Sequence, residues 1–466
     1  MIGKESNDKK TNSLKASNIE SNETSRKKPK LRIMHISDNV LPTLGGLERA
    51  VDTISNSWAD DGHEVFVVSS EKSSLPKTEK VRENLTVFRL PLLTARVPSA
   101  YKDQSRVFFP PVKDPLFATE FKKILKTVKP DIAHVHGWVL HSVIKALTSE
   151  GVPVISSAHD FGQVCAKKIL VNEKGEVCDG PGLRKCLTCS LDNYGIKGIP
   201  ITLALRRAGK NQLLLSKELA ISSAVANAKS AVKEKYQKDM TVLPTFISDE
   251  LLQKASNQPK PNWLPSSPYL LYVGVVHQSK GVQTLIDAYK SISDDIIGDI
   301  KLLIVGEPNK QTKIELSPGV ILVGKKNHNE ILGAMQRSLI TIVPSITPEG
   351  LSQTAVEALA ASAPLIVSNH GGLLDVVDNG RFALTFTPGD SQDLAAKISD
   401  LLRDPIKREK LSQAGPAQAG KFTLKEVKPR LLEMYYKAIE ENSKRRLSQS
   451  FSPREDLGDD LLQMGL

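Results

Sequence analysis

Residues 339–372 constrain the fold most, because this stretch changes from the periodicity of a strand to that of a helix and back. It opens with LITIVPS, an apolar run typical of a buried parallel strand, and Gly350 marks a turn after it. A helix follows, with Ser352 as its predicted N-cap, and Pro364 ends the helical pattern before a second apolar run, PLIVS. The stretch therefore predicts a strand–loop–helix–strand unit of a parallel sheet.

Two glutamates lie where this unit would bind a ligand. The loop after a parallel strand faces a crevice, and the free N–H groups at a helix start suit a diphosphate. Glu349 lies in the loop and Glu357 follows eight residues later, a little over two helical turns inward. An ionised carboxylate accepts two hydroxyl hydrogen bonds at once, which suits the vicinal diols of a ribose or sugar ring. Taken alone, such a pair is more often a solvated loop charge and a helix-surface charge.

Length and composition indicate an ordinary globular protein of two domains. The chain has 466 residues, of which 40% are apolar and 25% charged, enough to bury a sizeable core. Its formal net charge is +11, which is compatible with nucleic acid or an anionic membrane as a partner. Part of this charge is local, because residues 1–30 hold eight lysine and arginine residues against four acidic ones and almost no large apolar side chain. This segment is expected to be a disordered basic arm.

The same composition bears on location and partners. No stretch approaches the ~20 apolar residues of a membrane span, and the N-terminus lacks the apolar core of a secretory signal. A cytoplasmic protein is expected, with peripheral contact of the basic arm at the inner face of the membrane as a further expectation. Nucleic-acid binding is not expected, because no basic motif with interleaved aromatic residues occurs.

Residues 31–248 are predicted to form the first α/β domain. Apolar strands alternate with amphipathic helices along it, which indicates a parallel sheet. Gly45 and Gly46 lie where the first strand meets its helix, so their backbone is able to approach a phosphate or sugar; a tight structural turn explains them equally well. His159 follows the strand PVISSA directly, at the carboxyl end that faces a crevice in such a sheet.

Every cysteine of the chain lies in a Gly- and Lys-rich insertion at residues 161–198. The spacing is C-x12-C-x7-C-x2-C, and it combines a C-x-x-C pair with two further thiols. Such a set predicts a structural zinc site that staples a loop too polar to form a core. Reduced structural thiols and a redox-sensitive pair remain as alternatives. The predicted ligands are Cys165, Cys178, Cys186 and Cys189.

A second α/β domain is predicted at residues 269–425, after a linker at 249–268 that is rich in Pro, Ser and Asn. Lys280 lies at the start of its first helix, where its charge would add to the helix dipole in binding a diphosphate. A last amphipathic helix is expected at residues 426–441, followed by a polar tail at 442–466.

The motif around the two glutamates carries a family resemblance. PSITPEGLSQTAVEALA followed by PLIVSNHGG resembles the E-x7-E motif of retaining glycosyltransferases of the GT-B fold, family four. The resemblance implies two Rossmann-like domains with parallel sheets that face each other across a cleft. It also implies catalytic roles for His159 and Glu349, and binding of a nucleotide-diphosphate sugar by Gly45, Gly46, Lys280, Glu349, Gly350, Leu351 and Glu357. The last helix would cross back to the first domain.

Within that family some members carry a similar cysteine set after the histidine, and the insertion is expected to border the acceptor side. One departure concerns the stretch from Gly274 to Gly281, which resembles the family's element with Gly-Arg at its start and Lys-Gly at its end, and in which Val275 stands at the arginine position. A valine donates no hydrogen bond, so a phosphate contact would have to come from His277, Arg49 or backbone N–H groups. No D-x-D triplet occurs, so no catalytic divalent ion or other cofactor is expected at the donor diphosphate.

The predicted function is transfer of a sugar, with retention of configuration, to a glycan, lipid or small-molecule acceptor, in polysaccharide or glycolipid biosynthesis. The leaving diphosphate itself would take the acceptor's proton, and the protein would stabilise its charge. The first alternative is a non-catalytic GT-B binding or scaffold protein, which Val275 favours. An epimerase or a phosphorylase on the same architecture is the second.

Overall fold

The computed structural model describes residues 29–43, 45–72, 74–96, 107–172, 175–230, 240–308, 312 and 314–451. Almost all of the basic arm expected at residues 1–30 lies outside these residues, as does the part of the polar tail after residue 451. The described residues from Leu31 onward group into one unit by their contacts.

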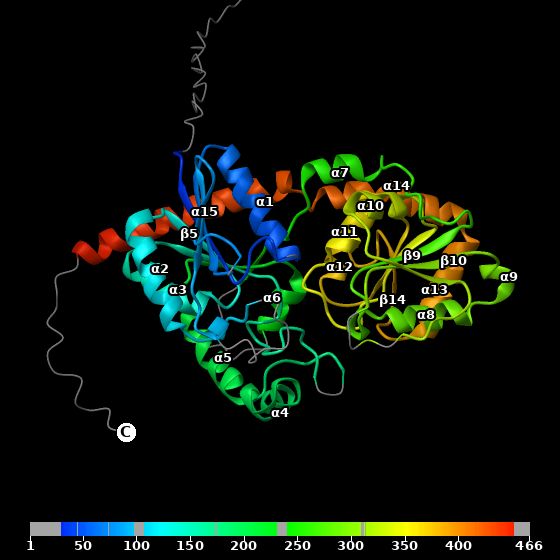
Figure 1. The fold of residues 1–466 in the computed structure, drawn as a ribbon, viewed down its shortest axis with the longest axis horizontal. Coiled ribbons are helices and arrows are strands. Elements are labelled where there is room, and N and C mark those ends of the chain that lie inside the picture. Colours follow the sequence, from blue (N-terminus) through cyan, green and yellow to red (C-terminus); the bar gives the residue numbers. More distant parts are fainter. Residues whose placement is uncertain are drawn as a thin grey trace, which may run out of the picture. The chain divides into compact units, whose positions relative to one another are not determined.

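The first sheet has, among the described residues, eight strands in the order β3-β4-β2-β1-β5-β6-β7-β8 (Figure 1). All neighbours pair in parallel except β3, which runs antiparallel to β4 at the edge. The strands are β1 (Arg32–Ser37), β2 (Glu64–Ser70), β3 (Thr78–Arg82), β4 (Leu85–Leu90), β5 (Ile132–His136), β6 (Val154–Ala158), β7 (Lys217–Ala220) and β8 (Thr241–Val242). The helices of this part are α1 (Gly46–Asp60), α2 (Pro115–Val128), α3 (Leu140–Ser149), α4 (Leu183–Tyr194), α5 (Gly198–Gln212) and α6 (Ser223–Ser230).

Each face of this sheet buries alternate residues of the strands. On β1, Ile33 packs in the cluster that contains Trp58 of α1, whereas Met34 packs in the cluster that contains Phe117 and Phe121 of α2. This alternation follows from the two-residue period of a strand and explains why the central strands are apolar on both faces.

The second sheet has six described strands in the order β11-β10-β9-β12-β13-β14, all parallel. Its strands are β9 (Tyr269–Val273), β10 (Lys301–Val305), β11 (Val320–Gly324), β12 (Ile340–Val343), β13 (Leu365–Ser368) and β14 (Leu384–Phe386). The helices are α7 (Asp249–Ala255), α8 (Val282–Ser291), α9 (Asp294–Ile297), α10 (His328–Arg337), α11 (Gln353–Ala360), α12 (Leu373–Val376), α13 (Ser391–Arg403) and α14 (Pro405–Gly420). Two apolar clusters cover its faces, one with α8 and α13 and one with α11 and α10.

These two sheets confirm the predicted fold class, an α/β protein with two Rossmann-like parallel sheets. The N-cap of α11 is also as predicted, because the Ser352 side chain accepts a hydrogen bond from the Ala355 N–H. The antiparallel strand β3 was not predicted. Its residues TEKVR are largely exposed and polar, so no apolar run marks them as a strand.

The last helix, α15 (Leu424–Phe451), packs on the first sheet although it follows the second in sequence (Figure 1). Val427, Leu431 and Tyr435 lie in the cluster that contains Trp58, and the Tyr435 hydroxyl is 2.7 Å from His134 Nδ1 on β5. The helix runs past residue 441, where the sequence pattern placed its end, because the polar residues that follow are compatible with a solvated helix.

Part of the segment expected as a linker, 249–268, is the helix α7, which the Ser248 side chain caps. Ala255 and Leu264 of this segment are buried against the second sheet's helices. None of the helices in the described part of the chain has the length and apolar character that crossing a membrane requires.

Strand order fixes where ligand-binding loops meet. In each sheet the order reverses between two central neighbours, β1 and β5 in the first and β9 and β12 in the second. The loops after such neighbours diverge to opposite faces and leave an opening at the carboxyl edge. The functional residues predicted from the sequence follow these strands or the adjacent β6.

Docking of α15 should contribute measurably to stability. Leu431 is 3% exposed in the cluster with Trp58, so Leu431→Ala removes apolar contacts and leaves a cavity, at a cost of about 2–5 kcal/mol of unfolding free energy. The same change at Leu447, on the same helix but 59% exposed, should cost less than about 0.5 kcal/mol. Chemical denaturation of both variants tests this, and equal effects would show that α15 is not held by the first sheet.

Candidate active site

Lys280 and Glu349 meet at the carboxyl edge of the second sheet. Lys280 ends the short 3-10 turn after β9, and Glu349 lies in the loop after β12. The Lys280 ammonium donates to Glu349 Oε1 at 2.9 Å, and the Ser345 hydroxyl donates to the same oxygen. The ammonium is thus held by a carboxylate at the point where the strand order reverses.

This ion pair sets the charge state of Glu349. Burial favours the protonated carboxyl, but the Lys280 charge and hydrogen bonds from Ser345, Lys280 and Ser352 outweigh it and lower the pKa of Glu349. Glu349 is therefore an anion near neutral pH. The Lys280 side chain stays 39% exposed, so its ammonium is within reach of a further anion.

A glycine makes this arrangement sterically possible. Gly281, between Lys280 and α8, has φ of 69° and caps the helix. A Cβ atom here would lie 1.8 Å from the Pro344 backbone oxygen after β12. Only glycine therefore allows the loops after β9 and β12 to approach this closely.

Glu357 lies on α11 and has a partner other than Lys280. Its Oε1 atom is 3.0 Å from His328 Nε2 at the start of α10, and this contact raises the pKa of His328. Arg49 of α1 donates to Gln353 Oε1, one turn before Glu357 on α11, at 3.3 Å. Helix α11 is thereby contacted by an arginine of α1 at its first residue and by a histidine of α10 one turn later.

The loop after β12 also contacts the loop that carries His159. A Cβ atom on Gly350 would lie 2.4 Å from the His159 backbone oxygen, so glycine is needed for this approach. Leu351 packs with Ala158 and Phe161 on one side and with the core of the second sheet on the other. The predicted residues His159, Glu349, Gly350 and Leu351 are therefore brought together.

The two glycines after β1 are placed differently. Gly45 is extended, with φ of 177°, a conformation open to any residue. Gly46 faces the Gln353 side chain, since a Cβ atom there would be 3.3 Å from Gln353 Oε1. Gly46, the first residue of α1, therefore lies beside the N-terminus of α11. Its role in donor binding stays a prediction.

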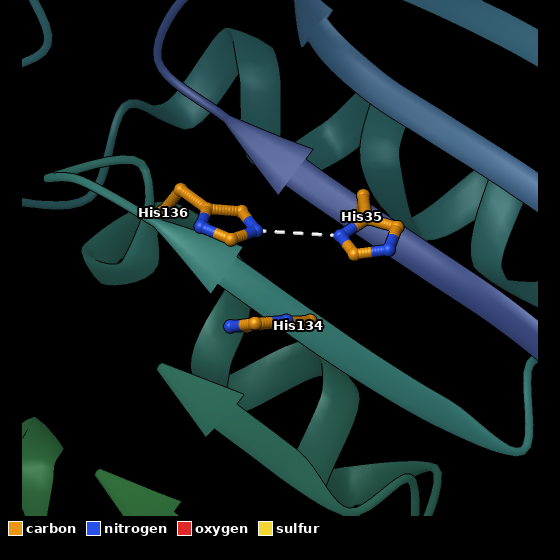
Figure 2. Close-up of side chains that lie close together, drawn as sticks. All are labelled: His35, His134 and His136. Atoms are coloured by element: carbon orange, nitrogen blue, oxygen red, sulfur yellow. Dashed lines mark hydrogen bonds between the residues drawn. The ribbon is translucent and has the colours of Figure 1, made fainter. Parts of the chain in front are cut away.

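His159 ends a chain of buried imidazoles. Its Nε2 atom is 3.0 Å from His136 Nδ1, and His136 Nε2 is 3.3 Å from His35 Nδ1 (Figure 2). Burial lowers the pKa of His159 to about 4 and that of His35 to about 3, and it holds the pKa of His136 well below the ordinary value. The chain is uncharged at neutral pH, so His159 offers hydrogen bonds but no positive charge.

Figure 2 shows that His35 of β1 and His134 and His136 of β5 point toward one another, and their ring nitrogens lie within 4.8 Å. This spacing would allow a metal ion. However, His134 already pairs with the Tyr435 hydroxyl at 2.7 Å and with the Ser157 hydroxyl at 2.8 Å, and the other two rings pair with each other. The arrangement is that of a hydrogen-bonded core network.

A cavity of about 930 Å³ lies at the carboxyl edge of the first sheet. Its wall includes His159 and the loops after β1 and β5. Lys168 lies in it, 3.6 Å from Asp38, 4.0 Å from Asp160 and 4.3 Å from the ring centre of Trp138. Burial raises the pKa of Asp38, while for Lys168 the two carboxylates outweigh burial and raise the pKa of the ammonium.

Asp38 also organises the cavity wall. Its carboxylate accepts hydrogen bonds from the backbone N–H groups of Val139 at 2.7 Å and Trp138 at 3.2 Å. These bonds fix the start of α3 beside the Trp138 indole. This part of the wall is therefore an aromatic ring flanked by the carboxylates of Asp38 and Asp160 and by the Lys168 ammonium.

Sequence reasoning did not identify Asp38, Lys168, Trp138 or His328. Asp38 follows the strand RIMHIS directly, and this position at a carboxyl end was a usable signal. Lys168 had no such signal in the sequence, because it reaches the cavity from the cysteine-containing segment. Val275 is 61% exposed, and in the same loop His277 Nδ1 accepts a hydrogen bond from the Ser279 N–H.

Two family models match this chain. Residues 253–418 match the model described as glycosyl transferases group 1, and residues 44–174 match glycosyltransferase family 4. The glycogen synthase of Mycobacterium tuberculosis is 26% identical over 416 residues, which cover 82% of this chain and 89% of that protein. The 2-deoxystreptamine N-acetyl-D-glucosaminyltransferase of Niallia circulans is 22% identical over 84% of this chain and 97% of its own.

Solved structures share the fold. The sucrose-phosphate synthase of Thermosynechococcus elongatus superposes with a TM-score of 0.65 at 18% identity, over 90% of this chain and all of that one. Anabaena HepE, solved in complex with UDP and glucose, gives 0.61 at 16% identity, over 87% of this chain and all of its own.

The two parallel Rossmann-like sheets and the solved structures that share them define a GT-B fold. Together with the family matches, they show that this chain belongs to the GT-B glycosyltransferases of the family-four type. It is a glycosyltransferase.

Removing the Lys280 ammonium should reverse the sign of the contribution that Glu349 makes to the free energy of unfolding at neutral pH. In Lys280→Met, burial is no longer opposed by that charge, so the pKa of Glu349 should rise above its unfolded value. The variant should then be about 1–3 kcal/mol less stable than the wild type at neutral pH, a loss reduced by the partial exposure of the pair. As pH falls, Glu349 takes up a proton and the difference should shrink.

Thermal unfolding from about pH 8 to about pH 3 measures this difference, because the stabilisation that ionised Glu349 contributes to the wild type is lost only as the pH falls through its lowered pKa. Lys254→Met is the control, because Lys254 pairs with Glu250 on an exposed helix face and its loss should have a small effect at every pH. A difference for Lys280→Met that does not change with pH would contradict the assignment.

Proposed function

We propose that this glycosyltransferase moves a sugar from a nucleotide-diphosphate sugar to a hydroxyl of the acceptor, with retention of anomeric configuration and without a divalent ion at the diphosphate. The observation that carries the proposal is the Lys280–Glu349 pair, which places an accessible ammonium and an ionised carboxylate at the switch point of the second sheet. A diphosphate needs the cation, and sugar hydroxyls need the anion.

The donor would bind along the loops after β9 and β12. The Lys280 ammonium would contact the diphosphate, and backbone N–H groups near Gly350 and Leu351 would add donors. Glu357, on α11, would accept from the ribose hydroxyls. Its contact with His328 supports this role, because His328 holds the carboxylate in one orientation until a hydroxyl replaces it.

Val275 removes a phosphate contact that the family motif would supply. Arg49 is the best-placed substitute, because its guanidinium already reaches the first residue of α11, where a helix start attracts anions. His277 is less suited, since its Nδ1 is already engaged as the cap of the turn at Gln278–Lys280.

The acceptor would lie in the cavity of the first sheet. Its volume of about 930 Å³ suits a molecule of one or a few sugar rings. Asp38 and Asp160 outnumber Lys168 at its wall, so an anionic acceptor would meet net negative charge. The Trp138 ring offers a face for stacking. These features favour a neutral, hydroxyl-bearing acceptor, such as a sugar unit of a glycan, a glycolipid head or a small molecule.

In the reaction, the protein's own task would be electrostatic. Lys280, Arg49 and backbone N–H groups would stabilise negative charge as the nucleoside diphosphate leaves, and a diphosphate oxygen would take the acceptor's proton. His159 is neutral, so it would hydrogen-bond the transferred sugar next to the reacting carbon rather than donate a charge. Glu349 would hold the hydroxyls of that sugar.

Cytoplasmic location, peripheral membrane contact of the basic arm and a part in polysaccharide or glycolipid biosynthesis stay predictions. The alternative of a non-catalytic GT-B binding protein rests on Val275 alone. A measurement of turnover would distinguish an active glycosyltransferase from a non-catalytic binding protein. The accessible Lys280 and the ionised Glu349 favour the enzyme.

Product stereochemistry tests the reaction type. With uridine, guanosine and adenosine diphosphate sugars offered against a panel of sugar acceptors, the product formed should carry the same anomeric configuration as the donor, as read by proton NMR. The rate should be the same with and without Mg²⁺ in buffers freed of divalent ions. An inverted product, or a rate that depends on Mg²⁺, would overturn the corresponding part of the proposal.

Neutralising Glu349 should separate its role from a structural one. Glu349→Gln keeps the shape but loses the anion, so kcat/KM should fall by about 10²-fold or more. Glu433→Gln, on an exposed face of α15, is the matched control and should leave kcat/KM unchanged. If Glu349→Gln binds and turns over donor as the wild type does, Glu349 has no part in the site.

A further inference from the structure

The four cysteines come together around a cavity of about 30 Å³. They reach it from different parts of one segment: Cys165 from the turn after β6, Cys178 from beside the Val171–Val177 bridge, and Cys186 and Cys189 from one face of α4. No disulfide joins them in the described part of the chain. The sulfurs therefore share one small space although 24 positions separate the first cysteine from the last.

The size and lining of this cavity select its ligand. A volume near 30 Å³ holds one water or one ion and excludes organic molecules, which need roughly 300 Å³ or more. Four thiols are the donor set of a soft divalent metal, and a tetrahedral Cys₄ set is a structural zinc site. The Gly182 N–H, 3.4 Å from Cys186 Sγ, supplies the kind of hydrogen bond that supports a thiolate.

We propose that Cys165, Cys178, Cys186 and Cys189 bind one structural zinc ion, and that this ion fixes the wall of the acceptor cavity. Among the described residues, only the histidines of Figure 2 bring three ligand atoms within 4.8 Å, so the four sulfurs must draw closer when zinc binds. Both ring nitrogens of His134 are paired, with Tyr435 and Ser157, and His35 pairs with His136, whereas Cys178 Sγ makes a weak hydrogen bond to the Gly180 oxygen at 3.3 Å.

The same segment that carries the cysteines supplies the acceptor cavity. Lys168 follows Cys165 in one turn, with its N–H bonded to the Cys165 oxygen at 3.0 Å. Asp192, Asn193 and Tyr194 form the last turn of α4, which begins three residues after Cys189, and all three line the cavity. The Tyr194 hydroxyl donates to the Ala166 oxygen at 3.0 Å and closes this wall. Zinc would therefore fix the positions of Lys168 and of α4 relative to Trp138.

The segment has little else to hold it. Leu183 and Leu191 of α4 are exposed, and Ser190 is its one buried residue. A helix with so little apolar burial is weakly stabilised by packing. A metal that closes residues 165–189 supplies the constraint that a core would otherwise provide.

Metal content tests the site independently of activity. Protein purified under reducing conditions and without a histidine tag should contain one zinc per chain by elemental analysis. The double variant Cys186→Ser/Cys189→Ser should contain almost none. Thr188→Ala is the matched control, because Thr188 lies between the two cysteines but is exposed, and it should keep the full zinc content.

Thiol labelling under native conditions distinguishes the alternatives. With zinc bound, the four thiols should react slowly with a thiol reagent and become reactive after a strong chelator is added. Four thiols that react at once in metal-free protein, together with no uptake of added Zn²⁺, would overturn the proposal. A disulfide detected by mass in protein prepared without reductant, with no zinc in the reduced form, would assign a redox pair instead and also overturn it.

The proposed link between zinc binding and the acceptor cavity rests on the proposed function, but the test of this link does not. Trp138 is buried against Lys168, so chelation of zinc should expose it and shift tryptophan emission to the red. Trp138→Phe should abolish that shift while keeping the zinc. UDP binding measured by calorimetry should not change on chelation, because the donor loops after β9 and β12 are not part of the cysteine segment. Zinc loss without a shift would limit the metal to the cysteine segment and overturn the link.

Discussion

The ion pair between Lys280 and Glu349 is the interaction on which the arrangement of the site depends. It joins the loops after the two central strands of the second sheet, where the strand order reverses. The pair keeps a buried carboxylate ionised, and Gly281 is what permits the loops to approach so closely. Charge and close backbone packing are therefore set by the same few residues.

The two sheets contribute different chemical groups to the site. The second sheet provides charge that is partly open to solvent, while the first provides a large cavity in which Lys168 is paired with Asp38 and His159 is neutral. Such a division suits a charged donor and a neutral acceptor. Contact between Gly350 and the His159 backbone joins the two environments.

Much of the second sheet could be predicted from the sequence. The apolar run of β12, the cap at Ser352 and the glutamate between them are local signals, since strand period, helix capping and turn residues act over a few positions. The edge strand β3 and the helix α7 were missed for the same reason, because polar or mixed segments carry little periodic signal.

The sequence by itself therefore determined the α/β class, the elements around Glu349 and the presence of a cysteine set. Only the tertiary structure decided that Arg49 reaches Gln353, that Lys168 lies between Asp38 and Asp160, and that the cysteines surround one cavity. The reason is that local patterns fix elements, whereas strand order and packing decide which residues far apart in the chain become neighbours.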